Sequence, residues 1–98
     1  MLDKAQILSF LKEHKEDFQK RFGVTKMGLF GSYARGTAQE ESDIDIAIEM
    51  DKKFKKIRFF LSLERELEGI FHKKVDLGIE SSLKPEAQKF IEKEIIYV

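Results

Sequence analysis

The sequence contains no cysteine and no tryptophan, and proline occurs once. Without cysteine, disulfide scaffolds and thiolate metal sites are both excluded. The sequence has nine phenylalanines and no tryptophan, which indicates a core built mainly from Phe, Leu and Ile.

Neither positive nor negative charge is in excess, because the net charge at pH 7 is +0. No strongly basic tail is present. Non-specific nucleic-acid binding grows with the number of phosphates that Lys and Arg neutralise. The balance therefore argues against dedicated binding of duplex DNA. It leaves room for a small anionic ligand, which needs only a local positive field.

No apolar run approaches the length of a transmembrane helix, and the N-terminus lacks the apolar stretch of a signal peptide. We therefore expect no membrane association and a cytoplasmic location. The 98 residues fit one domain, 1–98. Its core must be small, because a domain of this size leaves much of its surface wet.

The first expected element is a helix that ends near Gly23, a residue suited to a helix C-terminus. Asp3 followed by Gln6 has the pattern of a capping box at the helix start. Apolar residues recur at helical spacing between these ends: Ile7, Leu8, Leu11, Phe18 and Phe22.

Three strands are expected over residues 24–30, 43–50 and 74–79, and residues 95–98 could add a fourth strand at an edge. Side chains alternate between the two faces of a strand. The second strand thereby presents apolar side chains on one face: Ile44, Ile46, Ile48 and Met50.

A helix is expected over residues 54–71, with apolar residues that cover an arc of roughly 200°, twice the roughly 100° stripe of a surface helix. Either the sheet and a partner chain bury this helix from two sides, or it lies deep in its own core. Pro85 suits the first turn of a last helix that bears Ala87, Phe90 and Ile91. The order of elements predicts an α/β or α+β sandwich.

The most informative segment is Ser42-Asp43-Ile44-Asp45. Aspartate is disfavoured in strands, yet two occur here two residues apart. In a strand such residues point to the same side, about 7 Å apart along the backbone. If the carboxylates converge to about 5 Å, their repulsion is roughly 3 kcal/mol at an effective dielectric of about 20.

A hard divalent cation would offset this repulsion. Magnesium prefers oxygen ligands and bridges carboxylates to substrate phosphates. Asp76, inside another expected strand, would supply a third carboxylate if the two strands are neighbours. Three carboxylates suffice for two ions, one to orient a triphosphate and one to activate an attacking hydroxyl. Alternatively, Asp43 and Asp45 are solvated residues at a strand edge or turn.

Gly31-Ser32 directly follows the first expected strand and opens a helical turn. Glycine there lets the backbone approach an anion closely, while the Ser32 hydroxyl and the following N–H groups are donors. Arg35 adds a cation that can fork onto phosphate oxygens. Each feature alone is commonplace, since Gly-Ser is more often a tight turn and arginine a surface charge. The combination predicts phosphate donors beside metal-binding carboxylates.

Gly31-Ser32, followed after ten residues by Asp43-Ile44-Asp45, resembles the signature of the DNA polymerase beta-type nucleotidyltransferase superfamily. The fuller string from Gly31 to Gly36, Gly-Ser-Tyr-Ala-Arg-Gly, resembles the minimal nucleotidyltransferase branch of that superfamily. The Asp76 strand stands where the family carries its third carboxylate.

This resemblance implies a small mixed β-sheet flanked by helices. It implies that Asp43 and Asp45 bind two Mg²⁺ ions and that Asp76 helps to activate the acceptor hydroxyl. The reaction would be in-line attack on the α-phosphorus of ATP or another nucleoside triphosphate, with release of pyrophosphate. The implied nucleotide-binding residues are Gly31, Ser32, Arg35, Gly36 and Ser42.

Members of this branch resemble the antitoxin half of toxin–antitoxin pairs, which work beside a HEPN-type ribonuclease toxin that they can adenylylate on tyrosine. The wide apolar arc of helix 54–71 would suit such a partner, or a homodimer. A different function class stays open: a binding module that neutralises a toxin by occlusion, with weak or no catalysis. A calcium-binding domain is disfavoured, because the carboxylates lie on separate strands without dense loop spacing.

Overall fold

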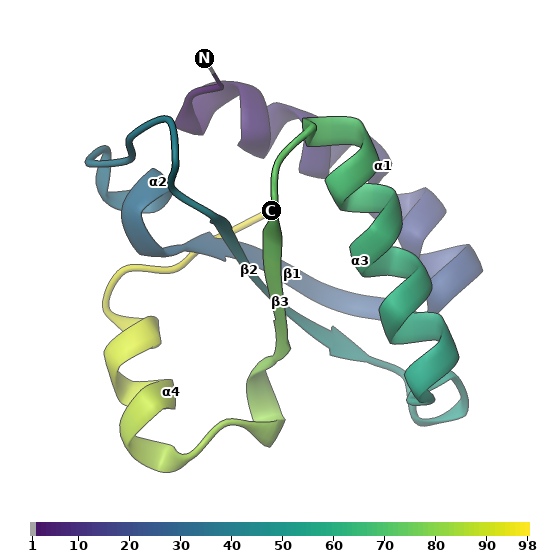
Figure 1. The fold of residues 1–98 in the computed structure, drawn as a ribbon. Coiled ribbons are helices and arrows are strands. Elements are labelled where there is room, and N and C mark those ends of the chain that lie inside the picture. Colours follow the sequence, from purple (N-terminus) through teal and green to yellow (C-terminus); the bar gives the residue numbers. More distant parts are fainter. Residues whose placement is uncertain (1) are drawn as a thin grey trace.

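The computed structural model describes residues 2–98, which form a four-stranded sheet flanked by helices (Figure 1). In chain order the helices and strands are α1 Lys4–Phe22, β1 Val24–Phe30, α2 Gly31–Arg35, β2 Ile44–Met50, α3 Ile57–Phe71, β3 Val75–Ile79, α4 Pro85–Glu92 and β4 Ile96–Tyr97. Two short 3₁₀ helices, η1 Lys52–Phe54 and η2 Glu80–Ser82, follow β2 and β3. The predicted α+β class is confirmed.

The sheet is mixed, with the strand order β3-β2-β1-β4. β1 pairs antiparallel with β2 and with β4, whereas β2 pairs parallel with β3. Two parallel neighbouring strands need a crossover connection, and α3 forms part of the connection from β2 to β3. The strands that carry Asp45 and Asp76 are therefore neighbours, as the prediction of a third carboxylate at this site required.

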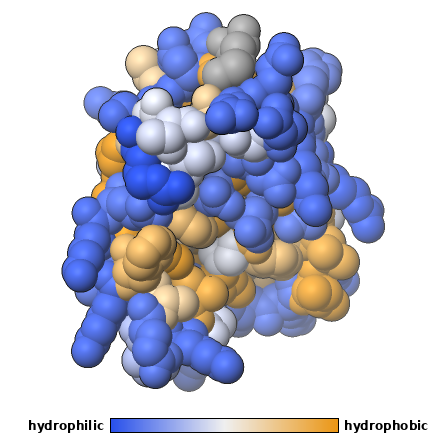
Figure 2. Space-filling view, turned by 60° about the vertical axis from the view of Figure 1, so that its left-hand side comes forward, coloured by the Kyte–Doolittle hydropathy of each residue, from blue (hydrophilic) through white to orange (hydrophobic). Residues whose placement is uncertain are grey.

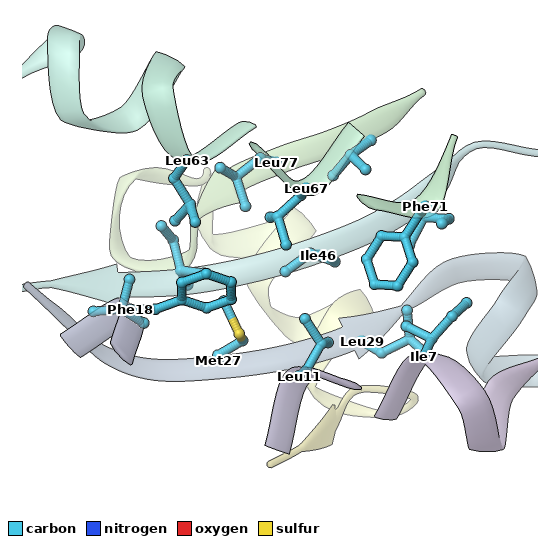
Figure 3. Packing of buried hydrophobic residues seen from close by; sticks show 14 of the residues in the cluster. Ile7, Leu11, Phe18, Met27, Leu29, Ile46, Leu63, Leu67, Phe71 and Leu77 are labelled. Atoms are coloured by element: carbon cyan, nitrogen blue, oxygen red, sulfur yellow. The ribbon is translucent and has the colours of Figure 1, made fainter. Parts of the chain in front are cut away.

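One face of the sheet packs against α1 and α3, and this is where the main core lies. Figure 3 shows side chains from both helices and from the strands pointing toward one another in this layer. The labelled core residues are Ile7, Leu11, Phe18, Met27, Leu29, Ile46, Leu63, Leu67, Phe71 and Leu77, and each is at most 6% exposed. Burial of such side chains typically stabilises a fold by about 1.5–3 kcal/mol each.

The ends of α1 follow the local sequence signals. Asp3 accepts a hydrogen bond from the Gln6 N–H at 2.8 Å, and the Asp3 N–H donates to the Gln6 side chain at 3.1 Å, which completes the predicted capping box. Gly23 ends the helix with φ of 67°, a left-handed conformation that glycine adopts without strain. Both helix ends were predicted correctly.

The helix predicted over 54–71 begins later, at Ile57. The preceding residues form η1 instead, whose start is fixed by Asp51, because its side chain accepts a hydrogen bond from the Lys53 N–H. The interpretation that this helix lies deep in its own core is wrong. Ile57 is 71% exposed, and Leu61 and Ile70 are each 37% exposed.

β1 has the predicted bounds, and the other strand boundaries differ from the prediction by at most one residue. Asp43 directly precedes β2 rather than lying in it, and Lys74 precedes β3. Pro85 occupies the first turn of α4, as predicted, and β4 is an edge strand as predicted but shorter. Within residues 2–98, the structure contains no helix with the length and apolarity needed to cross a membrane.

Candidate nucleotide site

The candidate site lies where three neighbouring strands meet the α2 turn. Phe30, the last residue of β1, pairs with Asp45 of β2, and Asp45 pairs with Asp76 of β3. α2 begins with Gly31, directly after Phe30. The sheet register therefore brings the Gly-Ser turn and two of the predicted carboxylates together, although they lie far apart in the sequence.

The alternation of β2 explains why the carboxylates face away from the core. Ile44 and Ile46 are fully buried among the core residues, so the intervening Asp45 projects from the opposite face of the sheet. Asp76 shares that face because it is the register partner of Asp45 in the adjacent strand. Neighbouring strands lie about 4.8 Å apart, so the two carboxylates are close neighbours.

Gly31 is required by geometry as well as by backbone conformation. Its φ is +77°, in the left-handed region that side chains disfavour. A Cβ at this position would stand 2.8 Å from Cγ of Asp45 and closer still to a carboxylate oxygen. The absence of a side chain thus lets the Asp45 carboxylate lie directly against the backbone of the turn.

The electrostatics of the site raise the pKa of Asp45 to about 6. Burial is the largest cause, because a half-buried carboxylate loses hydration, and the charges of Asp76 and Asp43 follow. Glu94 raises the pKa further and Arg35 opposes it. Part of the shift therefore comes from the two other predicted carboxylates, and the larger part comes from burial.

The other two carboxylates are more accessible than Asp45. Asp43 is partly buried just ahead of β2, and Asp76 is exposed. Within residues 2–98, no three acidic or histidine side chains already have their ligating atoms gathered as a metal site requires. The three aspartates are therefore neighbours with separated oxygens, a set that would have to converge around an ion.

Glu94, two residues beyond the end of α4, binds the α2 turn. The Gly31 N–H donates to one of its carboxylate oxygens at 3.1 Å, and Nη1 of Arg35 donates to the other at 2.8 Å. Its side chain is 15% exposed, against 47% for Arg35. A carboxylate thus occupies two of the donors that sequence analysis assigned to phosphate.

The other predicted nucleotide-binding residues have distinct places. Ser32 is partly buried in α2, and its carbonyl accepts the Thr37 N–H at 3.0 Å. Gly36 ends α2 with φ of +77° in open space. Ser42 belongs to the loop before β2, where its hydroxyl accepts the Gln39 N–H at 2.9 Å. Ser42 therefore shapes the loop that leads into Asp43.

Sequence analysis missed Glu94. Its partner Arg35 lies 59 positions away in the chain, so no local spacing relates them. An acidic residue between a helix and an edge strand has no signature of its own. The contact depends on the pairing of β4 with β1, which brings the C-terminal part of the chain close to the α2 turn.

A hollow of about 300 Å³ lies away from the carboxylates, among residues that include Met50, Ile57, Phe60 and Ile79. It adjoins the far end of β2, so it is separate from the α2 turn. Figure 2 shows the side that carries α2 and α4: its upper part is mostly hydrophilic, and apolar surface gathers in its lower part.

The sequence is similar to those of known nucleotidyltransferases. The family described as "Nucleotidyltransferase domain" matches residues 11–98. The protein adenylyltransferase MntA of Thermococcus cleftensis is 41% identical over 98 residues, which cover 100% of this chain and 98% of that protein.

Solved structures give the same fold. A protein described as a "putative minimal nucleotidyltransferase" superposes with a TM-score of 0.80 at 28% identity, covering 97% of this chain and 95% of its own. A toxin–antitoxin complex crystallised with AMP-PNP gives a TM-score of 0.66 at 23% identity, with 98% of this chain and 72% of that chain covered. The second likeness bears on the fold alone.

Proposed function

Since this chain belongs to the nucleotidyltransferase domain family, in its minimal antitoxin-like branch, we propose that it transfers AMP from ATP to a hydroxyl of a partner toxin, with magnesium as cofactor. Nucleotidyl transfer is the activity of the family. The donor ATP, the protein acceptor and the metal are the proposed parts, as is a cytoplasmic setting.

One observation carries the proposal: the register that aligns Phe30, Asp45 and Asp76 across three strands. It sets backbone donors of the Gly31 turn beside two carboxylates on the face of the sheet opposite the main core. An NTP needs both groups, because donors hold the phosphate oxygens while carboxylates hold the cations that neutralise them.

The residues divide into two groups by role. Gly31 and Ser32 would donate to the triphosphate, and Arg35, freed from its ion pair, would fork onto phosphate oxygens. Asp43 and Asp45 would bind the metal, and Asp76 would accept the proton of the acceptor hydroxyl. That oxygen bonds to the α-phosphorus as the bond to the β-phosphate oxygen breaks, and pyrophosphate leaves.

The donor set fits magnesium. Its members are all oxygen donors, and burial together with the charges of Asp76 and Asp43 raises the pKa of Asp45, a cost that a divalent cation would relieve. Bound magnesium would supply charge neutralisation on the triphosphate and a lowered pKa for the acceptor hydroxyl. The carboxylates need only converge, since Asp45 and Asp76 already occupy paired register positions.

The partner in this proposal is a HEPN-type toxin. The support is analogy: the T. cleftensis relative is named a protein adenylyltransferase, and a chain of the same fold is part of a toxin–antitoxin complex. The exposed apolar residues of α3, Ile57, Leu61 and Ile70, would suit contact with such a partner. A homodimer is the competing use of that surface.

The test is incubation of the purified chain with α-labelled ATP, magnesium and its cognate toxin, resolved on a denaturing gel. We expect label on the toxin, lost in Asp43→Asn. Glu41→Gln is the matched control, because it removes one exposed carboxylate from the same loop. Label that persists in Asp43→Asn would overturn the assigned role of Asp43.

The alternative function is a binding module that neutralises its toxin by occlusion. It would be favoured by a tight complex in which no protein acquires label, and by Asp43→Asn protecting cells as well as the unchanged protein. A small-molecule acceptor would show as labelled low-mass product with both proteins unlabelled.

A further inference from the structure

Glu94 holds two donors of the α2 turn from a fixed position. The backbone N–H groups of Glu94 and Ile95 both donate to the Ile91 carbonyl, at 3.0 and 2.9 Å, which anchors residue 94 to the end of α4. From there the carboxylate accepts from Gly31 N–H and from Arg35. The fold thus holds the Glu94 end of this contact in place, while the Arg35 end stays about half exposed.

The chemistry of this contact matches that of a bound phosphate. A carboxylate that accepts from a backbone N–H and a guanidinium uses the charge-assisted hydrogen bonds that phosphate oxygens also use. The same donors cannot serve both anions at full strength. The Glu94 charge also reaches the carboxylate cluster, since it contributes to the raised pKa of Asp45.

We propose that Glu94 is an internal competitor of the nucleotide, which occupies the phosphate donors of the α2 turn in the free protein and is displaced when a triphosphate binds. This rests on the proposed function, because it takes Gly31 and Arg35 as phosphate donors. Displacement transfers both donors to phosphate oxygens and removes a negative charge from beside the polyphosphate. Glu94 thereby sets the affinity for triphosphate.

The test measures binding by calorimetry with Mg²⁺ and α,β-methylene-ATP, an analogue that cannot be cleaved at the α-phosphorus. Glu94→Gln keeps the size of the side chain and removes its charge. We expect it to bind the analogue about tenfold more tightly than the unchanged protein, within the usual range of coupling between competing ligands. Glu92→Gln, an equal charge change at an exposed position two residues away, should bind as the unchanged protein does.

A coupling test separates competition from a general loss of negative charge. In an Arg35→Ala background, Glu94→Gln should give a clearly smaller gain in affinity, because one of the contested donors is gone. Adenosine, which has no phosphate, should bind Glu94→Gln and the unchanged protein equally. If Glu94→Gln raised the affinity for adenosine as much as the affinity for the triphosphate analogue, the proposal would be overturned.

Displacement can also be observed without any substitution. In the unchanged protein, saturation with the analogue should shift the ¹³C resonance of the Glu94 carboxylate and the Gly31 amide resonance together. A Glu94 resonance that stays in place while the Gly31 amide moves would overturn the proposal. Weaker binding in Glu94→Gln would overturn it too, since Glu94 would then be a positioning residue for Arg35.

Failure of the function and failure of this inference are distinguishable. If the unchanged protein binds no triphosphate with magnesium, the proposed function itself fails. If the unchanged protein binds the analogue and Glu94→Gln binds it no more tightly, the function stands and the competition fails.

Discussion

The two faces of the sheet are made by the same strands and do opposite things. On the covered face, Ile44, Ile46 and Ile48 of β2 are at most 1% exposed and pack beneath α1 and α3. On the other face, the same strand presents Asp45 beside Asp76, where burial and then the neighbouring like charges raise the pKa of Asp45. The covered face stabilises the fold by apolar burial, whereas ionised Asp45 on the other face opposes folding.

This difference means that one strand can tolerate an unfavourable site because its other face is secure. Apolar burial contributes a few kcal/mol per side chain, which exceeds the cost of keeping carboxylates near each other at a partly solvated surface. Substitutions on adjacent residues should therefore change stability in opposite directions. The following experiments test that contrast.

The largest effect on stability should come from the covered face. Ile46→Ala removes a fully buried side chain and should lower the free energy of unfolding by about 2–5 kcal/mol. Ile57→Ala is the matched control, because Ile57 is 71% exposed and its loss should cost within about 0.5 kcal/mol. Urea denaturation measures both, and equal losses would break the comparison.

The next largest effect should come from the glycine at the site. Gly31→Ala adds a left-handed strain of about 1–3 kcal/mol and a collision with Asp45, so it should also weaken nucleotide binding. Gly36→Ala has the same φ of +77° but open space around it, so only the strain applies. The difference between the melting temperatures of the two variants measures the effect of the collision alone. Gly31→Ala should melt at the lower temperature, and equal melting temperatures would disprove the collision.

Asp45→Asn should stabilise the metal-free protein while it abolishes magnesium-dependent nucleotide binding. The pKa of Asp45 is about 6 in the folded state against 3.8 for the unperturbed group, so its ionisation opposes folding. The advantage of Asn should be full above pH 6, decline as pH falls from about 6 to 3.8, and vanish below. Melting temperatures across pH, without divalent ions, check this; an advantage independent of pH would contradict it.

The smallest effect should come from a helix cap on the covered face. Asp3→Ala removes the side-chain acceptor for the Gln6 N–H and should cost about 1 kcal/mol. Nucleotide affinity should not change, because the Asp3 side chain accepts its hydrogen bond from α1 and not from the α2 turn. A calorimetric change in affinity would show that the two faces are coupled.

Much of this fold could be predicted from local patterns. The alternation of β2 identified its buried residues, the capping box and Gly23 bounded α1, and Pro85 marked the start of α4. These signals act within a few residues, where backbone geometry and hydrogen bonding depend on neighbours in the chain.

What could not be predicted depends on contacts distant in sequence. An apolar arc on α3 does not reveal how much of it the sheet covers, and the structure leaves Ile57, Leu61 and Ile70 exposed. The later start of α3 follows from Asp51, which caps a 3₁₀ turn that hydropathy alone does not distinguish from helix. The contact of Glu94 with Arg35 likewise needs the whole topology.

The parallel pairing of β2 with β3 has a consequence for the order in which the site assembles. The antiparallel β1–β2 unit closes a short stretch of chain and brings Gly31 to Asp45. Asp76 arrives only after α3 has crossed the sheet, and Glu94 only when the chain end returns to β1. Because closing longer loops costs more entropy and slows folding, we expect the α2 turn to form early and its contacts with Asp76 and Glu94 late. During synthesis on the ribosome, the α2 turn and Asp45 would thus come together before Glu94 has emerged.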